Sequence, residues 1–417
     1  SVFIPSTTFA QPPDTLWTKT WDLGGGDERA ESVQPTRDGG FVICGLGDFG
    51  VGFYTAWVQR LDSDGDSIWQ WDLGGNLTEG ANYVEQTRDG GFIVAGSTWS
   101  YSPGQTHAAA VVKLNSQGQI RWVSLWDHPI VDDTAVTVRE LPNGDVIVCA
   151  WHGYWPALWR LDAQGNTLWT SVFYEIPSSI SAWTRFVEPT SDGGFVIAAM
   201  IDFTGASQMM AVLIKADADG NMVWYHQYPE EDSIESQFYC VRELTNGDLI
   251  ACGYDWDWDA VDQWHDWYVV RTDAQGEIIW EIQAQGEFNE RAHSLIVTSD
   301  NNIVITGVQR GPDIPFFLTR KYNLDGNLLW EDSQPNGEGW SVSQARDGGY
   351  AITGPRMIES FSTSEDFFMF KYESEVTVDL VPEITLVPTE GGSISFSGSM
   401  SNILVNETTL DVWASVT

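Results

Sequence analysis

The chain has 417 residues, with 59 acidic and 20 basic side chains, a formal charge of −39 and 22 tryptophans. Such a negative field repels nucleic acid and anionic lipid, so we exclude both as partners. The sequence holds no stretch of about 20 apolar residues, which excludes insertion of a helix into a membrane.

The first segment, residues 1–13, is an apolar arm that ends on two prolines. It contains Val2, Phe3, Ile4 and Phe9, a composition suited to a strand donated to another chain. Because the chain starts at Ser1 without Met and shows no signal peptide, we expect a mature extracellular or cell-surface protein, after signal peptide removal.

Residues 14–22 (DTLWTKTWD) come next and resemble a strand type that recurs later in the chain. Trp17 stands in this strand before any of the turns that precede its later copies. The later tryptophans each follow an Asp/Asn-x-x-Gly turn: Trp69, Trp122, Trp169, Trp224, Trp280 and Trp330. The first copy is therefore out of phase with the others.

A second signal alternates with these tryptophans and occurs seven times. It is an Asp-Gly or Asn-Gly turn, or a close variant, followed by an apolar run, and its copies begin at residues 38, 89, 143, 192, 246, 300 and 347. Each unit reads as four short strands rich in β-branched and aromatic residues; in the first unit these are 29–37, 40–46, 56–61 and 66–72. A period of roughly 50 residues without helical patterning predicts the blades of a β-propeller.

The last unit lacks a fourth strand, and residues 14–22 supply the missing type. We therefore predict an all-β fold: a seven-bladed β-propeller of four-stranded blades over residues 14–375, in which residues 14–22 complete the last blade. The repeat resembles a family of secreted bacterial propellers with units of the type DGGYIIAG…WLIKTDSNGNxxWxxxxGG. That resemblance covers nearly the whole chain and implies the fold, but it implies no catalytic site.

Basic residues and cysteines also follow the repeat. Seven bases stand two residues before the Asp/Asn-x-x-Gly turn and are expected to pair with blade carboxylates: Arg60, Lys113, Arg160, Lys215, Arg271, Lys321 and Lys371. Cys44, Cys149 and Cys252 share one repeat position that suits a small buried side chain. Cys240 and Cys252 flank the turn at Asn246 symmetrically, so a cross-strand disulfide stays open.

The loops between second and third strands are long and rich in aromatics. Tryptophan and tyrosine interleaved with Asp suit sugar rings, which stack on aromatic faces and donate hydroxyls to carboxylates. The same side chains could instead pack between blades. As a ligand site we predict Trp99, Tyr101, Trp151, Tyr154, Trp155, Trp256, Trp258 and Trp264.

Asp62, Asp64 and Asp66 are spaced like the oxygen ligands of a calcium loop, so Ca²⁺ is the candidate cofactor. The alternative interpretation is a glycine-requiring turn, because other units build the same turn with fewer acids. The six histidines show no metal-type spacing, no nucleophile elbow is present, and we predict no catalytic residue.

Residues 376–417 read as β-strands that resemble an incomplete immunoglobulin-like segment. Its unpaired edges invite a strand from a neighbouring chain, and with the N-terminal arm they predict assembly through Val2, Phe3, Ile4, Phe9, Val412 and Trp413. The leading hypothesis is thus a non-enzymatic structural or adhesive propeller that self-associates into a fibre or surface layer. The alternatives are a glycan-binding, lectin-like propeller and a polysaccharide hydrolase or lyase.

Overall fold

The computed structural model describes residues 11–21, 28–48, 53–73, 77–102, 106–128, 131–176, 178–203, 208–229, 233–257, 265–284, 288–311, 314–357, 365–375, 378–379 and 399–400. The chain divides into Ser1–Glu373 and Ser374–Thr417. In the second part β29 (Val378–Asp379) pairs antiparallel with β30 (Ser399–Met400). The predicted assembly residues Val2, Phe3, Ile4, Phe9, Val412 and Trp413 lie outside the described residues. No helix long and apolar enough to cross a membrane occurs in the described ranges.

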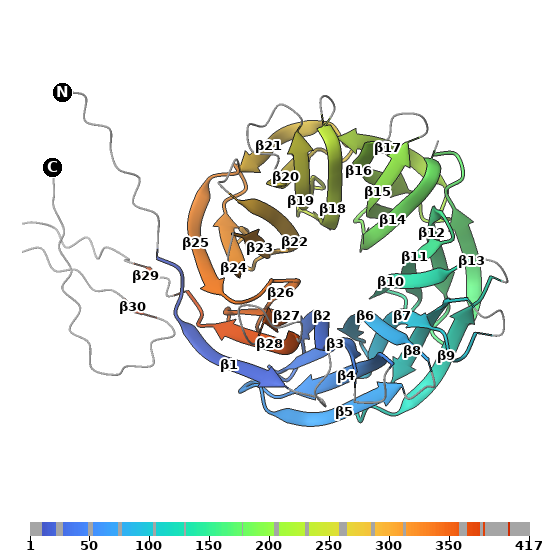
Figure 1. Cartoon of the computed structure of the whole chain (residues 1–417), viewed down its shortest axis with the longest axis horizontal. Helices are drawn as coiled ribbons and strands as arrows, with labels where there is room; N and C mark the ends of the chain where they lie inside the picture. The colour runs from blue at the N-terminus through green and yellow to red at the C-terminus, as the bar shows by residue number, and fades with distance from the viewer. Residues whose placement is uncertain are drawn as a thin grey trace, which may run out of the picture. The chain divides into compact units, whose positions relative to one another are not determined.

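The first part is built of four-stranded antiparallel groups that surround a central axis (Figure 1). We number the groups 1 to 7 by their innermost strands, which are β2 (Glu28–Pro35), β6 (Glu79–Gln86), β10 (Asp133–Glu140), β14 (Ser178–Pro189), β18 (Ser233–Glu243), β22 (Asn289–Val297) and β26 (Ser341–Gln344). The second strands are β3 (Phe41–Gly47), β7 (Phe92–Thr98), β11 (Val146–His152), β15 (Phe195–Phe203), β19 (Leu249–Asp257), β23 (Ile303–Arg310) and β27 (Tyr350–Met357).

The third strands are β4 (Thr55–Leu61), β8 (Ala108–Leu114), β12 (Trp155–Leu161), β16 (Gln208–Ala216), β20 (Asp266–Thr272), β24 (Pro315–Tyr322) and β28 (Glu365–Tyr372). The outer strands are β5 (Ser67–Leu73), β9 (Ile120–Trp126), β13 (Thr167–Val172), β17 (Met222–Tyr228), β21 (Ile278–Ala284), β25 (Leu328–Pro335) and β1 (Thr15–Trp21). Groups 4 and 5 also share one parallel pairing, Met209 with Glu235. The prediction of an all-β fold of repeated four-stranded sheets is confirmed.

Strand β1 pairs antiparallel with β28, so the first strand of the chain lies beside the last strand of the repeat. Trp21 stacks on Phe367 with ring centroids 4.4 Å apart, and Trp17 meets Phe41 of group 1 edge-on at 6.1 Å. The out-of-phase strand therefore contacts both group 7, through β28, and group 1, through Phe41.

Burial explains the strand types. The second and third strands are almost wholly buried, as their continuous apolar runs require, whereas the outer strands alternate between exposed and half-buried residues. The Asp-Gly-Gly hairpins also need their second glycine, because a Cβ on Gly40 would lie 2.2 Å from the Leu61 carbonyl oxygen. The repeat in the sequence thus reflects the same buried strands and tight hairpin in each group.

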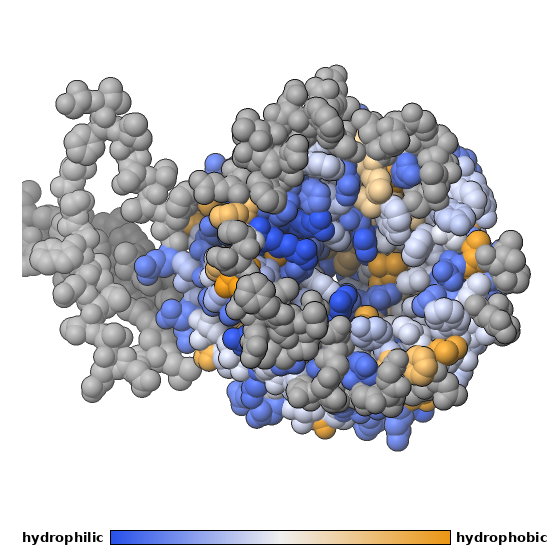
Figure 2. Space-filling view, viewed as in Figure 1, coloured by the Kyte–Doolittle hydropathy of each residue, from blue (hydrophilic) through white to orange (hydrophobic). Residues whose placement is uncertain are grey.

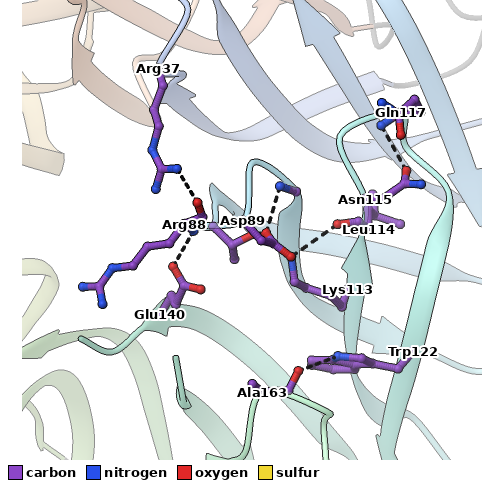
Figure 3. Close-up of polar contacts among 12 residues, drawn as sticks. Arg37, Arg88, Asp89, Lys113, Leu114, Asn115, Gln117, Trp122, Glu140 and Ala163 are labelled. Carbon is purple, nitrogen blue, oxygen red and sulfur yellow. Dashed lines mark hydrogen bonds and ion pairs between the residues drawn. The ribbon is translucent and has the colours of Figure 1, made fainter. Parts of the chain in front are cut away.

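The outer-strand tryptophans connect neighbouring groups. The indole Nε1–H donates to a carbonyl in the Asp/Asn-x-x-Gly turn of the next group from Trp69 to Ser116 at 3.1 Å, from Trp122 to Ala163 at 3.1 Å and from Trp280 to Leu324 at 2.9 Å (Figure 3 shows the second). Trp17 makes the same contact with Ser63 at 3.3 Å. A Cβ on Gly118 would lie 2.9 Å from the Trp69 ring, so glycine is required where the indole packs.

The seven repeated bases pair with the hairpin carboxylates as predicted. The pairs are Arg60–Asp38, Lys113–Asp89, Arg160–Asp145, Lys215–Asp192, Arg271–Asp248, Lys321–Asp300 and Lys371–Asp347. Arginines beside the same hairpins bond the next group: Arg37 donates to the Arg88 carbonyl at 2.5 Å, and Arg346 donates to the Arg37 carbonyl (Figure 3 shows the first). Repeated charges therefore hold the groups together.

These pairs predict acid lability. Burial would raise the pKa values of Asp89, Asp192 and Asp300, but hydrogen bonds from threonine and lysine neighbours outweigh it and lower each to about 2 from the usual 3.8. A lowered folded-state pKa stabilises the fold above the unfolded value, and this contribution is lost as the pH falls from about 4 towards 2. We expect the melting temperature of the wild type to fall across that window. The fall should be smaller in Lys113→Met, because that variant already lacks one of the pairs.

Lys19→Met is the control, because the Lys19–Asp66 pair is exposed and should contribute little at any pH. Melting curves recorded in steps between pH 5 and pH 2.5 measure both variants. An equal slope for wild type and Lys113→Met would contradict the assignment.

All four cysteines are buried and free. Cys240 and Cys252 face each other in the β18–β19 register, but no disulfide joins them. Burial raises the pKa of the Cys149 thiol to about 12 and that of Cys252 well above its usual value. The thiols therefore serve as small core side chains.

Candidate functional site: the central channel

The innermost strands surround a cavity of about 510 Å³, which we call the central channel. Side chains from all seven groups line it, and Figure 2 shows strongly hydrophilic residues around the central hollow of one face. Aromatic side chains join them, among them Trp151, Trp183 and Trp340. A polar, partly aromatic cavity of this size is a typical small-molecule or oligosaccharide site.

A β-bulge positions one lining side chain in six of the innermost strands. At one equivalent place in each of the six, the register between innermost and second strand slips by one residue, and the extra residue lines the channel: Glu31, Asn82, Val136, Arg185, Tyr239 and His293. In group 7, Trp340, which lies just before β26, lines the central channel. Bulges commonly re-aim a side chain beside a functional site.

The bulged residues differ from group to group although their surroundings repeat. Each is followed two residues later by Val or Leu, as in Ala30-Glu-Ser-Val33 and Ala292-His-Ser-Leu295. Sequence reasoning missed this ring of residues, yet aligning the seven repeats with one another would have shown a variable position inside a constant frame. A position that the fold does not constrain is available for function.

Charge in the channel differs from charge elsewhere. Four of the 20 basic side chains line it but only two of the 59 acidic ones, Glu31 and Glu338. Of the four arginines, Arg242 pairs with Glu188 and Arg310 with Glu338. Arg185 and Arg291 have no carboxylate partner among the described residues. The channel lining therefore has more basic than acidic side chains, in contrast to the strongly acidic protein as a whole.

Arg185 is held by the wall of group 5. With the Gln237 amide oriented to satisfy its neighbours, Arg185 Nε and Nη2 donate to its oxygen at 2.6 and 3.0 Å, and the amide nitrogen donates to the Tyr239 hydroxyl at 3.1 Å. The guanidinium also lies 5.2 Å from the centroid of the Tyr239 ring. Because these partners are neutral, they orient the cation without cancelling its charge.

Arg291, on β22 of group 6, is held in a similar way by group 5. Its Nε donates to His265 Nδ1 at 3.0 Å, and its guanidinium lies 4.7 Å from the centroid of the Tyr254 ring. Burial and the charge of Arg291 lower the pKa of His265 to about 4, so this histidine is neutral at pH 7. This neutral partner therefore orients Arg291 without offsetting its charge.

His293, two residues after Arg291 on β22, also lines the channel. Its Nδ1 is 3.0 Å from the Gly339 carbonyl oxygen, which can only accept, so Nδ1 carries the proton. Burial lowers the pKa of His293 to about 4, which leaves Nε2 with a free lone pair at neutral pH. The ring meets Tyr239 edge-on at a centroid distance of 4.9 Å.

Towards the hairpin turns, an ion network crosses four groups. Arg139 binds Glu85 at 3.1 Å and Glu188 at 2.5 Å, and Arg242 binds Glu188 at 3.0 Å. Arg242 lies 4.2 Å from the centroid of the Phe186 ring. Burial raises the pKa of Glu85. Carboxylates therefore neutralise Arg139 and Arg242, in contrast to Arg185 and Arg291.

The structure brings one of the predicted aromatic ligand residues into the channel. Trp151 lines it, 6.3 Å from Trp183. The other described ones lie elsewhere: Trp99 beside His107, Tyr101 exposed on the same loop, Tyr154 and Trp155 near Tyr174, and Trp256 beside His265. Trp258 and Trp264 lie outside the described residues.

The predicted calcium residues build a turn. Asp62 accepts the amides of Asp64 at 2.9 Å and Asp66 at 2.8 Å, while Asp66 pairs with Lys19. Asn115 makes the same two bonds with a neutral side chain. Within the described ranges no cluster of three His, Cys, Asp or Glu residues could hold a metal ion. The turn geometry therefore does not depend on a cation.

No protein-family model and no curated protein matches the chain. Among solved structures, the WD40 domain of Neurospora crassa Pan2 matches with a TM-score of 0.54 and 10% identity, covering 89% of this chain and 98% of that one. A Dyadobacter fermentans protein of unknown function matches with a TM-score of 0.51 and 10% identity, covering 87% of this chain and 99% of that one.

A polysaccharide lyase, described as an ulvan lyase, matches at a TM-score of 0.49 and 9% identity over 88% of this chain and 96% of that one, a likeness too weak to carry an argument. At these identities the comparisons show the fold alone and leave binding, structural and enzymatic functions open. The chain is an all-β protein with a propeller-like fold of repeated four-stranded sheets.

Proposed function

We propose that the protein binds an acidic saccharide in its central channel. The observation that carries this proposal is the pair Arg185 and Arg291, which line the channel and have no carboxylate partner among the described residues. Both guanidinium groups are half-buried in the channel wall, where an anionic ligand would meet them with less competition from water than at an open surface. Carboxylate or sulfate groups on the ligand would meet these guanidinium groups, while Trp151, Trp183 and Trp340 offer faces for sugar rings.

Replacing either arginine should weaken binding strongly. For Arg185→Gln and Arg291→Gln we expect the dissociation constant for a polyuronate to rise roughly 10- to 100-fold, since a hydrogen bond to a charged group contributes about 1.5–3 kcal/mol. Wild-type binding should also weaken with added salt, because part of the attraction is between charges. Titration calorimetry or affinity electrophoresis measures both effects.

Arg121→Gln is the matched control, because Arg121 is an exposed base on the outer strand β9 and should leave binding unchanged. Equal loss in all three variants would point to net charge rather than a site. Binding of neutral and acidic glycans with equal affinity would also contradict the proposal.

We also propose that groups 1 to 7 are seven blades of one ring that β1 closes. The β1–β28 pairing, the contact of Trp17 with the Ser63 turn and the bond from Arg346 to the Arg37 carbonyl support it. Assembly through the terminal segments and an extracellular location stay predictions. Self-association through an arm is compatible with a binding channel, as in an adhesive subunit.

A further inference from the structure

Two bulged residues with acid–base chemistry lie side by side in the channel wall. Tyr239 on β18 and His293 on β22 are the extra residues of neighbouring innermost strands, and their rings are 4.9 Å apart. Arg185, which has no carboxylate partner among the described residues, contacts the same group through Gln237 and the Tyr239 ring. The guanidinium of Arg185, the phenol of Tyr239 and the imidazole of His293 thus lie in one part of the channel wall.

Hydrogen bonding fixes what each of these groups can do. His293 donates Nδ1–H to the Gly339 carbonyl, so its Nε2 can accept a proton. The Tyr239 hydroxyl accepts from the Gln237 amide and retains its own proton for donation. Burial lowers the pKa of His293 and so keeps the imidazole neutral at pH 7, with Nε2 unprotonated.

These groups match the needs of one reaction on an acidic sugar. In a uronate residue linked through O4, the C5 hydrogen lies next to the carboxylate, and it becomes acidic when a cation neutralises that carboxylate. A base must then take the C5 proton while an acid protonates the departing O4. With a uronate as the ligand, Arg185 and Arg291 would neutralise its carboxylate. His293 would be the base and Tyr239 the acid.

We infer that the central channel cleaves uronate-containing polysaccharides by β-elimination, with His293 as base and Tyr239 as acid; this rests on the proposed binding function. His293 Nε2 removes the C5 proton, the C–H electron pair forms the C4=C5 double bond, the C4–O4 bond breaks, and Tyr239 protonates O4. Proton exchange with water returns the imidazolium and phenolate to their starting forms. No oxidant, reductant or water molecule is consumed.

Hydrolysis fits the lining less well. A glycosidase needs two carboxylic groups flanking the scissile bond. The lining offers Glu31 and Glu338, and Glu338 is held by Arg310 Nε at 2.8 Å and by Trp340 Nε1 at 3.1 Å. Elimination requires neither carboxylate.

The test uses the full chain with polygalacturonate, alginate and hyaluronan, and with dextran as the neutral control. Elimination produces a double bond conjugated with the carboxylate, which absorbs ultraviolet light, whereas hydrolysis produces only new reducing ends. We expect absorbance to rise with at least one polyuronate and not with dextran. His293→Gln and Tyr239→Phe should each lower the rate by about 100-fold or more, while binding stays within a few-fold.

Tyr174→Phe and His226→Gln are matched controls outside the channel lining and should keep the wild-type rate. Polyuronate binding without ultraviolet product would overturn the elimination but leave the binding proposal standing. No binding to any polyuronate or to a sulfated glycan would overturn both. Product formation that survives both His293→Gln and Tyr239→Phe would place the chemistry elsewhere.

Discussion

Removing residues 1–21 should destabilise the whole first part of the chain rather than one strand. The deletion leaves β28 without its outer neighbour and removes the stacking of Trp21 on Phe367 and the contact of Trp17 with Phe41. Truncating a packed tryptophan typically costs about 3–5 kcal/mol, so we expect the free energy of unfolding to fall by at least about 5 kcal/mol. The newly exposed edge of β28 in group 7 should also promote aggregation.

Chemical denaturation followed by tryptophan fluorescence measures the loss, and a synthetic peptide of residues 11–22 added in trans should restore part of it. Deletion of residues 1–13 is the control: it spares β1 and should change stability by less than about 0.5 kcal/mol. The same short deletion tests assembly, because polymers that persist without the arm would refute the role of Val2, Phe3, Ile4 and Phe9. Unchanged stability after loss of β1 would refute closure.

Much of the fold followed from the sequence because the repeat encodes packing between groups. Trp69, Trp122 and Trp280 donate to the turn of the next group, and the base before each turn pairs with the hairpin carboxylate. These contacts recur with the repeat, so their spacing was visible in the sequence. Even the odd position of Trp17 had a structural meaning, since it marks a strand that pairs far along the chain with β28.

The channel could not be predicted in the same way, because the residues that line it differ from one repeat to the next. Attention to loop aromatics found Trp151 but not Arg185, Tyr239 or His293, which lie inside strands. A one-residue bulge leaves almost no trace in a polar/apolar pattern. Net charge was also misleading, since −39 overall conceals a channel with more arginines than carboxylates.

The second large effect is expected at the ion network beside the channel. Arg139→Met should destabilise the protein by about 3–5 kcal/mol at pH 7, because it leaves Glu85 buried without its cation and Glu188 with Arg242 alone. Burial already raises the pKa of Glu85 above its usual 4.5. Removing Arg139 takes away a charge that lowers it, so the folded-state pKa should rise further.

The sign of the pH dependence follows from that rise. A carboxyl whose folded-state pKa is raised is tolerated when protonated, so the stability lost in Arg139→Met should be smallest below about pH 4.5 and grow as the pH rises through the folded-state pKa. Denaturation at pH 4.5 and pH 7.5 measures it. A deficit that is independent of pH would mean that lost packing, and not charge, sets the cost.

The matched control is the double variant Glu85→Gln/Arg139→Met, which removes both charges of one pair and leaves Glu188 with Arg242. Replacing a whole buried pair is often nearly neutral, so the double variant should recover most of the stability that Arg139→Met loses. Its saccharide binding should also match wild type, because Arg185 and Arg291 are untouched. Recovery of stability with intact binding would distinguish two sets of arginines. Arg139 and Arg242 pair with carboxylates and support the channel wall, whereas we propose that Arg185 and Arg291 hold the ligand.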